Sequence, residues 1–251
     1  MADEIERAAQ DLLAELELTP PNAAPGQNML APNARRDVGA TPLWRAHDGP
    51  ATLFVHGWND THRIWRQFAQ DFIANARPVL LMDLPAHGAS KAAAFGQAEA
   101  GQAVRDVCEA EAPIDAIIAH SFGCIATAAA LQSGARADYV ILIAPPVLGW
   151  ETRQRRKGTD PAVVDRVLKI LAHEGRALPE AFDFQAALAG FDGKLLFIGS
   201  DDDDICPLDD IAGVAGRVPG AEIVAVDGLD HRDLCLDRQV LAAILAFLGY
   251  A

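Results

Sequence analysis

Ser121 has the residue type and the setting of a nucleophile. It follows the apolar run Ile117–Ala119 and His120, and Gly123 comes two positions later in a small-residue helical pattern. A strand, a sharp turn and a helix would leave the serine hydroxyl exposed beyond the end of the strand. This hydroxyl is a weak nucleophile until a general base accepts its proton, so the chain should also supply a histidine and a carboxylate. The alternative is an ordinary serine at a helix N-cap.

His231 is the predicted general base. It follows the last predicted strand, Ala221–Val226, and comes three residues after Gly228. In this role it would take the Ser121 proton during attack on a carbonyl and return it to the leaving group.

The acid that would orient this base comes from four consecutive aspartates, residues 201–204. Its task is to accept a hydrogen bond from the imidazole. Asp202 lies three residues after Gly199, and Asp203 lies four residues before Pro207. Each of these two neighbours is therefore a candidate. We expect Asp203, with Asp202 as the alternative. A calcium site is disfavoured because the run lacks the alternating spacing and the glycine of a calcium loop, and no metal is expected.

Short apolar runs with little alternation predict the strands that must position these residues. Such runs suit strands that are buried on both faces of a parallel sheet. Most are separated by stretches with helical periodicity, so we predict an α/β fold with a mostly parallel central sheet flanked by helices. The serine, aspartate and histidine all follow strands, where sheets of this kind build their sites. The predicted strands are Ala51–Val55, Pro78–Met82, Ile114–Ala119, Tyr139–Ala144, Lys194–Ile198 and Ala221–Val226.

The chain divides into three predicted parts. Residues 1–42 read as an N-terminal segment, with an amphipathic helix over 3–18 and then a linker rich in proline, asparagine and glycine. Residues 43–146 and 194–251 form the core, and residues 147–193, which show no convincing strand, form a small helical cap. The N-terminal helix is expected to pack on its own domain; a homodimer contact is the alternative.

Together these motifs resemble the α/β-hydrolase family, in particular its cap-bearing esterase-, lipase- and C–C hydrolase-like members. The resemblance covers about residues 43–250. It rests on His56-Gly57, on Asp83–Ser90, on the Ser121 turn and on Gly228–His231. It implies a serine nucleophile that works without a cofactor.

The resemblance also implies two backbone donors for an oxyanion, the N–H groups of Trp58 and Phe122. Their side chains would line the substrate site, with core packing as the alternative. Ala119 departs from the family pattern, which has a glycine at that position of Gly-x-Ser-x-Gly. The added methyl group leaves less space between strand and helix, but Ser121 can still act as the nucleophile. The resemblance assigns structural roles, in bonding loops near the site, to His56, His87 and His120.

The composition disfavours several classes of partner. With 21 basic and 35 acidic residues the net charge is −14, which argues against binding nucleic acid or an anionic membrane surface. The acidic start of the sequence predicts no export leader, and the lack of a long apolar run predicts no membrane-spanning helix. Four separated cysteines predict free thiols in a reducing cytoplasm, with a Cys206–Cys235 disulfide as the alternative. The basic run Arg153–Lys157 is expected to be a solvated helix face, or else to recruit an anionic substrate.

The predicted function is hydrolysis of a small carboxylic ester through an acyl-enzyme intermediate. The same groups can cleave thioesters, amides, lactones or a C–C bond beside a ketone, so a thioesterase or C–C hydrolase is the alternative. A ligand receptor or signalling protein on the same fold is a hypothesis of another class. A metal-dependent hydrolase would lose activity with a chelator, and no such loss is expected.

Overall fold

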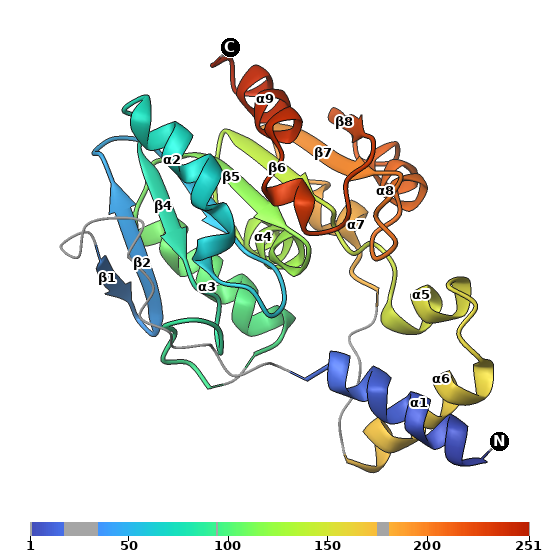
Figure 1. Cartoon of the computed structure of the whole chain (residues 1–251). Helices are drawn as coiled ribbons and strands as arrows, with labels where there is room; N and C mark the ends of the chain where they lie inside the picture. The colour runs from blue at the N-terminus through green and yellow to red at the C-terminus, as the bar shows by residue number, and fades with distance from the viewer. Residues whose placement is uncertain (1, 18–34, 94, 175–180, 251) are drawn as a thin grey trace.

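The computed structural model describes residues 2–17, 35–93, 95–174 and 181–250. Within them one eight-stranded sheet has the order β1-β2-β4-β3-β5-β6-β7-β8 (Figure 1). The six strands from β3 onward pair in parallel, as predicted. The strands are β1 (Arg35–Val38), β2 (Thr41–Ala46), β3 (Ala51–Val55), β4 (Val79–Met82), β5 (Ile114–His120), β6 (Tyr139–Ile143), β7 (Lys194–Ser200) and β8 (Ala221–Val226).

Five of the six predicted parallel strands, β3 to β7, are buried on both faces of the sheet. All residues of β3 and β4 are buried, and in β5, β6 and β7 only the first or second residue is not. Continuous apolar runs satisfy such positions, because helices cover both faces of the sheet (Figure 1). The α/β architecture read from the sequence is therefore confirmed.

The first two strands were not predicted. Residues 35–42, assigned above to a linker, include β1 and the start of β2, which pair antiparallel at the edge of the sheet. The sequence of β1 is Arg-Arg-Asp-Val and its first three residues are exposed. It forms a strand because its backbone pairs with β2. Its polar sequence contains no pattern of apolar residues from which a strand could be predicted. Residues 18–34 of the predicted linker lie outside the described residues.

Helices connect the strands. The 3-10 helix η2 precedes α2, and α3 packs along α4 on the sheet. The helices are α1 (Ala2–Glu15), η2 (His62–Trp65), α2 (Arg66–Ala74), α3 (Gln97–Ala110), α4 (Phe122–Gln132), α5 (Trp150–Arg156), α6 (Pro161–His173), α7 (Phe184–Leu188), α8 (Leu208–Ala215), η3 (Asp233–Cys235) and α9 (Arg238–Phe247).

Helices α1, α5 and α6 form a small unit with its own core. Figure 1 shows them together beyond the end of the sheet, and their buried residues make a cluster separate from the main core. Arg166 on α6 also pairs with Glu6 on α1 at 2.6 Å. Helix α7 instead packs against α4 and belongs to the main core. The members of the small core are Ala9, Leu13, Trp150, Val163, Val164, Val167 and Leu171.

The N-terminal helix thus lays its apolar residues on α6 of the same chain. Ala9 and Leu13 are buried there, and Ile5 and Leu12 pack at the margin. This is the packing expected for an amphipathic helix that finds its partner within the chain. A homodimer through this helix stays a prediction.

All four cysteines are buried free thiols, so the alternative of a Cys206–Cys235 disulfide is not realised. Burial raises the pKa of the thiols of Cys108 (to about 12), Cys124, Cys206 and Cys235. No helix among the described residues has the length and apolar character needed to cross a membrane.

Candidate active site

The Ser121 turn joins β5 to α4. Ser121 has φ 52° and ψ −123°, a conformation that a residue with a side chain rarely adopts. Its N–H donates to the Ile143 carbonyl at 2.9 Å, and its own carbonyl accepts from Cys124 N–H at 2.9 Å. The hydroxyl makes no capping bond to α4. The turn therefore presents the serine side chain outward, and the N-cap alternative does not describe it.

Two glycines allow this turn to sit close to the neighbouring loop. A Cβ on Gly123 would lie 2.6 Å from the carbonyl oxygens of both Val55 and His56. A Cβ on Gly57 would lie 2.9 Å from the Ser121 Cβ. Ala119, in the position where a glycine was expected by resemblance, is fully buried opposite Val55 in the β5–β3 pair. Its methyl group is accommodated there, as expected.

His231 lies in the loop between β8 and η3 and bridges two side chains. Its Nε2 is 2.9 Å from Ser121 Oγ, and its Nδ1 is 2.7 Å from Asp203 Oδ2. The imidazole is partly buried and the carboxylate almost wholly so. The structure thus brings hydroxyl, imidazole and carboxylate into one hydrogen-bonded line.

The two candidate acids have different partners. Asp203 is 1% exposed, and its Oδ1 accepts from the N–H groups of Ile205 and Cys206 at 2.8 and 2.9 Å. These bonds orient the carboxylate so that Oδ2 meets the imidazole. Asp202 is exposed, and its Oδ2 instead accepts from Gly228 N–H at 2.7 Å. Asp203 therefore contacts His231, whereas Asp202 braces the loop that carries it.

The carboxylates of the aspartate run do not converge on a common point. Asp202 and Asp203 bond the partners just described, and Asp204 pairs with Lys157 at 3.0 Å. Among the described residues, the group with metal-ligating spacing is Asp203, Cys206 and His231, whose ligand atoms lie within 4.8 Å of one another. Two of these three already bond each other directly, so the geometry there is that of a hydrogen-bonded pair.

Two buried histidines hold the surrounding loops. His56 Nε2 accepts from Leu84 N–H at 2.9 Å, so its Nδ1 carries the proton and donates to the Gly57 carbonyl at 2.8 Å. His120 Nε2 donates to the backbone carbonyl of His231 at 2.8 Å. Burial lowers the pKa of His56 to about 4 and that of His120 to about 3. Both rings are neutral at neutral pH.

We expect the protein to lose stability in mild acid because of these two rings. The unfolded chain binds protons as the pH falls through 6.5, whereas folded His56 and His120 bind them only near pH 4 and pH 3. The contribution of the two neutral rings to the free energy of unfolding is fully present above pH 6.5. Below pH 6.5 it is lost at about 1.4 kcal/mol per pH unit for each ring. Urea denaturation between about pH 7.5 and 5 measures this slope.

The matched variants for this slope are His120→Gln and His173→Gln. His173 is exposed at the end of α6, so His173→Gln is the control for removing a histidine outside the core. Loss of His120 should reduce it by about 1.4 kcal/mol per pH unit. A free energy of unfolding that is flat over this range would contradict the assignment.

The predicted oxyanion donors border the serine. Phe122 is the first residue of α4, where the helix dipole favours negative charge. Trp58 follows Gly57, which packs against Ser121, and the next N–H, of Asn59, is held by His87 Nε2 at 3.2 Å. Within the described part of the chain, neither the Trp58 nor the Phe122 N–H has an acceptor. Both donors are therefore available to a bound group.

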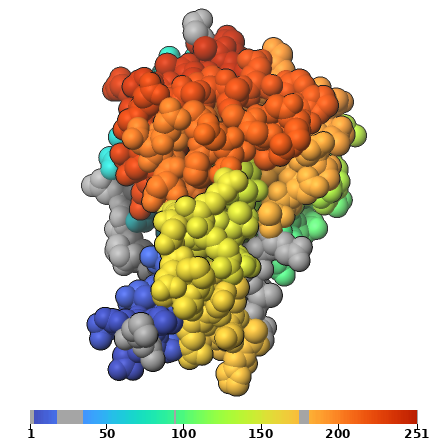
Figure 2. Space-filling view, turned by 90° about the vertical axis from the view of Figure 1, so that its right-hand side faces the viewer, coloured from blue at the N-terminus to red at the C-terminus, as the bar shows by residue number. Residues whose placement is uncertain are grey.

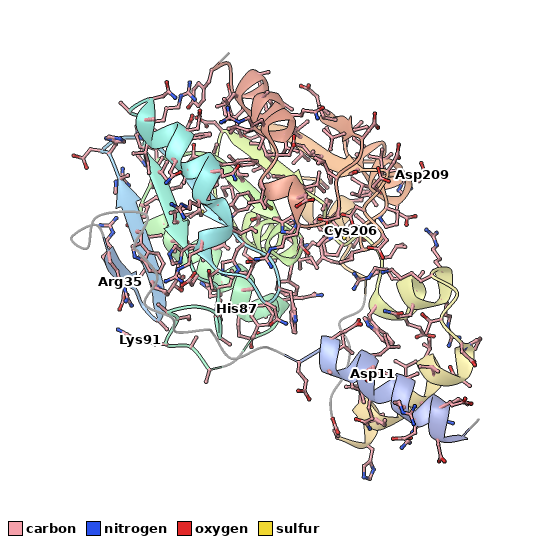
Figure 3. All side chains as sticks on the ribbon, viewed as in Figure 1. Asp11, Arg35, His87, Lys91, Cys206 and Asp209 are labelled. Carbon is pink, nitrogen blue, oxygen red and sulfur yellow. The ribbon has the colours of Figure 1, made fainter. Side chains whose placement is uncertain are left out.

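Aromatic rings adjoin this end of the site. The rings of Trp58 and Phe122 lie 6.0 Å apart, and Phe95 lies 5.0 Å from Trp58 and 4.7 Å from Phe122. His87, labelled in Figure 3, completes the cluster at 4.6 Å from Phe95. Sequence reasoning missed Phe95, because it lies in an alanine-rich stretch between predicted elements and belongs to no motif. Trp58 and Phe95 are partly exposed, so the cluster packs on the core and also presents an apolar surface.

Comparison with known proteins fixes the family. Residues 52–244 match the sequence model of a family described as the alpha/beta hydrolase family, which is well over half of the chain. The chain belongs to the alpha/beta hydrolase family. No functionally curated protein matches the sequence.

Solved structures share the alpha/beta hydrolase fold at low identity. An esterase from Rhodococcus sp. ECU1013 is 17% identical with a TM-score of 0.65, covering 83% of this chain and 94% of that one. A suggested non-heme bromoperoxidase, BpoC, from Mycobacterium tuberculosis H37Rv is 16% identical with a TM-score of 0.64, covering 82% and 94%. A thermophilic esterase from Thermogutta terrifontis is 16% identical with a TM-score of 0.61, covering 92% and 96%. At these identities the likeness establishes the fold.

Proposed function

We propose that this alpha/beta hydrolase cleaves small carboxylic esters through a triad of Ser121, His231 and Asp203. The observation that carries the proposal is the continuous line of hydrogen bonds from Ser121 Oγ through His231 to Asp203 Oδ2. A serine hydroxyl within 2.9 Å of an oriented imidazole is the arrangement that nucleophilic acyl transfer requires.

The proposed reaction has two steps. In the first, Ser121 Oγ attacks the carbonyl carbon while His231 Nε2 takes its proton, and the oxyanion accepts from the N–H groups of Trp58 and Phe122. The intermediate collapses to an acyl-enzyme when the alcohol leaves with the proton from His231. In the second, a water molecule gives its proton to His231 and attacks the acyl group; the acid then leaves as the bond to Ser121 Oγ breaks and His231 returns the proton to that oxygen. Each oxyanion donor is worth about 3 kcal/mol of transition-state stabilisation.

Among the substrates that these groups could cleave, an ester is the preferred class. The site contains one nucleophile, one base and two amide donors, and this set makes no demand on the leaving group beyond its accepting one proton. Esters have a better leaving group than amides, and the aromatic cluster of Trp58, Phe95 and Phe122 suits a small apolar acyl or alkyl chain. A thioesterase or a C–C hydrolase with the same triad is the alternative within the class, and a ligand receptor is the alternative outside it.

The direct test is covalent labelling followed by turnover. A fluorophosphonate should add to Ser121 of folded protein, as seen by intact mass and peptide mapping, and heat-denatured protein should not react. A panel of p-nitrophenyl esters of increasing chain length, with matched thioesters, then ranks the substrates. Absence of an adduct on folded protein would reject the serine hydrolase. An adduct without turnover on any member of the panel would favour the receptor.

We also propose that the protein acts in the cytoplasm. The support is its cysteine chemistry, since four buried thiols without a disulfide suit a reducing compartment.

A further inference from the structure

The oxyanion loop, residues 57–61, carries Trp58, whose N–H is one of the two proposed oxyanion donors. The next residue, Asn59, has a φ of 56°, a left-handed conformation that asparagine adopts more readily than most residues. Two of its N–H groups bind different parts of the chain. The backbone N–H donates to His87 Nε2 at 3.2 Å, and the side-chain Nδ2 donates to the backbone carbonyl of Glu17 at 3.1 Å. Asn59 therefore joins the oxyanion loop to the segment that follows α1.

Helix α1 defines the position of the Glu17 carbonyl. The N–H of Glu17 donates to the Ala14 carbonyl at 3.3 Å, so the chain continues as a turn beyond Glu15, the last helical residue. Helix α1 itself packs on α6 through buried residues that include Leu13. The acceptor of the Asn59 side chain thus belongs to the three-helix unit of α1, α5 and α6, and not to the core around the sheet.

The three-helix unit is attached to the core at a second place, through the basic run of α5. Arg156 pairs with Asp210 on α8, and Lys157 pairs with Asp204 at 3.0 Å. Figure 2 shows this contact, with α5 in yellow lying against the orange surface around residue 200. These two basic residues therefore tie α5 to the loop that follows β7 and to the helix after it.

The two attachments lie on opposite sides of Ser121. The order of the central strands is β3-β5-β6-β7, and Ser121 directly follows β5. Asn59 follows β3 and Asp204 follows β7, so the attached loops flank the serine. Because the carboxyl ends of these parallel strands share one edge, a unit that contacts both loops spans that edge. Figure 1 shows α1 and α5 beyond this end of the sheet, with the C-terminal end of α1 turned toward the core.

The contacts of Asn59 bear on the direction of the Trp58 N–H. This N–H belongs to the planar peptide unit whose carbonyl is that of Gly57, and the next peptide unit contains the Asn59 N–H. His56 Nδ1 donates to the Gly57 carbonyl at 2.8 Å, and His87 holds the Asn59 N–H. The side-chain bond of Asn59 adds a contact from outside the core. With both peptide units held, the direction of the Trp58 N–H between them is fixed.

We propose that Asn59 is a positioning residue for the Trp58 N–H, and that α1 acts through it as a working part of the active site. The inference rests on the proposed hydrolase and adds to it a helix that lies outside residues 52–244, the part matched by the family model. An oxyanion forms only in the transition state. Loss of this support should therefore lower kcat and leave KM nearly unchanged.

Steady-state kinetics on two substitutions of Asn59 test this effect. Asn59→Gly removes the bond to Glu17 and keeps the left-handed backbone, whereas Asn59→Asp keeps the size of the side chain but offers no donor. Each should lower kcat for p-nitrophenyl butyrate about five- to tenfold and change KM less than about twofold. The matched control is Asn75, an exposed asparagine whose Nδ2 also donates to a backbone carbonyl, that of Asp71, at 2.8 Å. Asn75→Gly and Asn75→Asp should keep both constants.

A variant of α1 approaches the same contact from its other end. Leu13→Ala removes buried apolar contacts between α1 and α6 and so loosens the helix that holds the Glu17 carbonyl. Alone it should lower kcat about fivefold. In the Asn59→Gly background it should have less than about a twofold further effect, because the contact is already lost. A protein that is merely destabilised would show additive losses instead.

Amide hydrogen exchange separates the contact from the hydrolase itself. Peptides that cover residues 57–61 should exchange faster in Asn59→Gly and in Leu13→Ala than in wild type, and at the wild-type rate in Asn75→Gly. If this result came with no turnover of any ester by wild type, the hydrolase would fail and the coupling of α1 to the oxyanion loop would stand. Equal exchange in all four proteins, additive losses of kcat in the double variant, or losses confined to KM would each overturn the proposal.

Discussion

Ser121→Ala is expected to lower kcat for p-nitrophenyl esters by a factor on the order of 10⁵–10⁶. In the proposed mechanism the hydroxyl supplies the bond-forming atom, and without it His231 has no proton to accept at 2.9 Å. The proposed oxyanion donors and binding surface remain in this variant, so we expect a small residual rate over water. Burst and steady-state release of p-nitrophenol measure both phases.

The control for this loss is a serine at the other end of the same helix. Ser133 caps α4 at its C-terminus and is exposed, so Ser133→Ala should keep full activity. Alanine at position 121 meets the same positive φ as serine, which makes a large change in stability unexpected. A Ser121→Ala protein that folds and keeps more than a hundredth of the wild-type kcat would reject Ser121 as the nucleophile.

Asp203→Asn is expected to lower kcat by about 10⁴-fold, whereas Asp202→Asn should cost less than about tenfold. An asparagine at position 203 can offer its N–H₂ group to His231 Nδ1, which turns the imidazole into the wrong tautomer to accept the Ser121 proton. At position 202 the amide oxygen can still accept from Gly228 N–H, so the His231 loop keeps its brace. Each of the two variants removes one negative charge, and the two positions are adjacent in the chain.

Steady-state kinetics on both variants decide between the two acids. Hydrogen-bond loss at Asp203 should act on kcat more than on KM, because it weakens proton transfer and not substrate binding. The reverse ranking, with Asp202→Asn the more damaged enzyme, would move the triad acid by one residue. Equal and small losses would remove both from the mechanism.

The fold was readable from the sequence because burial and chain order are local signals. The run Ala51–Val55 predicted a strand at its observed position, since a parallel strand covered on both faces requires nearly continuous apolar residues. The run Ala221–Val226 also predicted its strand, although β8 lies at the edge of the sheet and all but one of its residues are partly or fully exposed. The β1–β2 hairpin escaped because β1 is polar and exposed, and its pairing depends on a neighbour and not on its own composition.

The sequence by itself also placed Ser121, Asp203 and His231 after strands of one sheet, because the carboxyl ends of parallel strands share an edge. It could not choose between Asp202 and Asp203, since consecutive side chains of a loop point in different directions that only the folded backbone defines. The tertiary structure decided that Asp203 contacts His231, that Phe95 joins the aromatic cluster, and that Asn59 binds the segment that follows α1. Each of these depends on contacts between segments far apart in the chain, which no local pattern encodes.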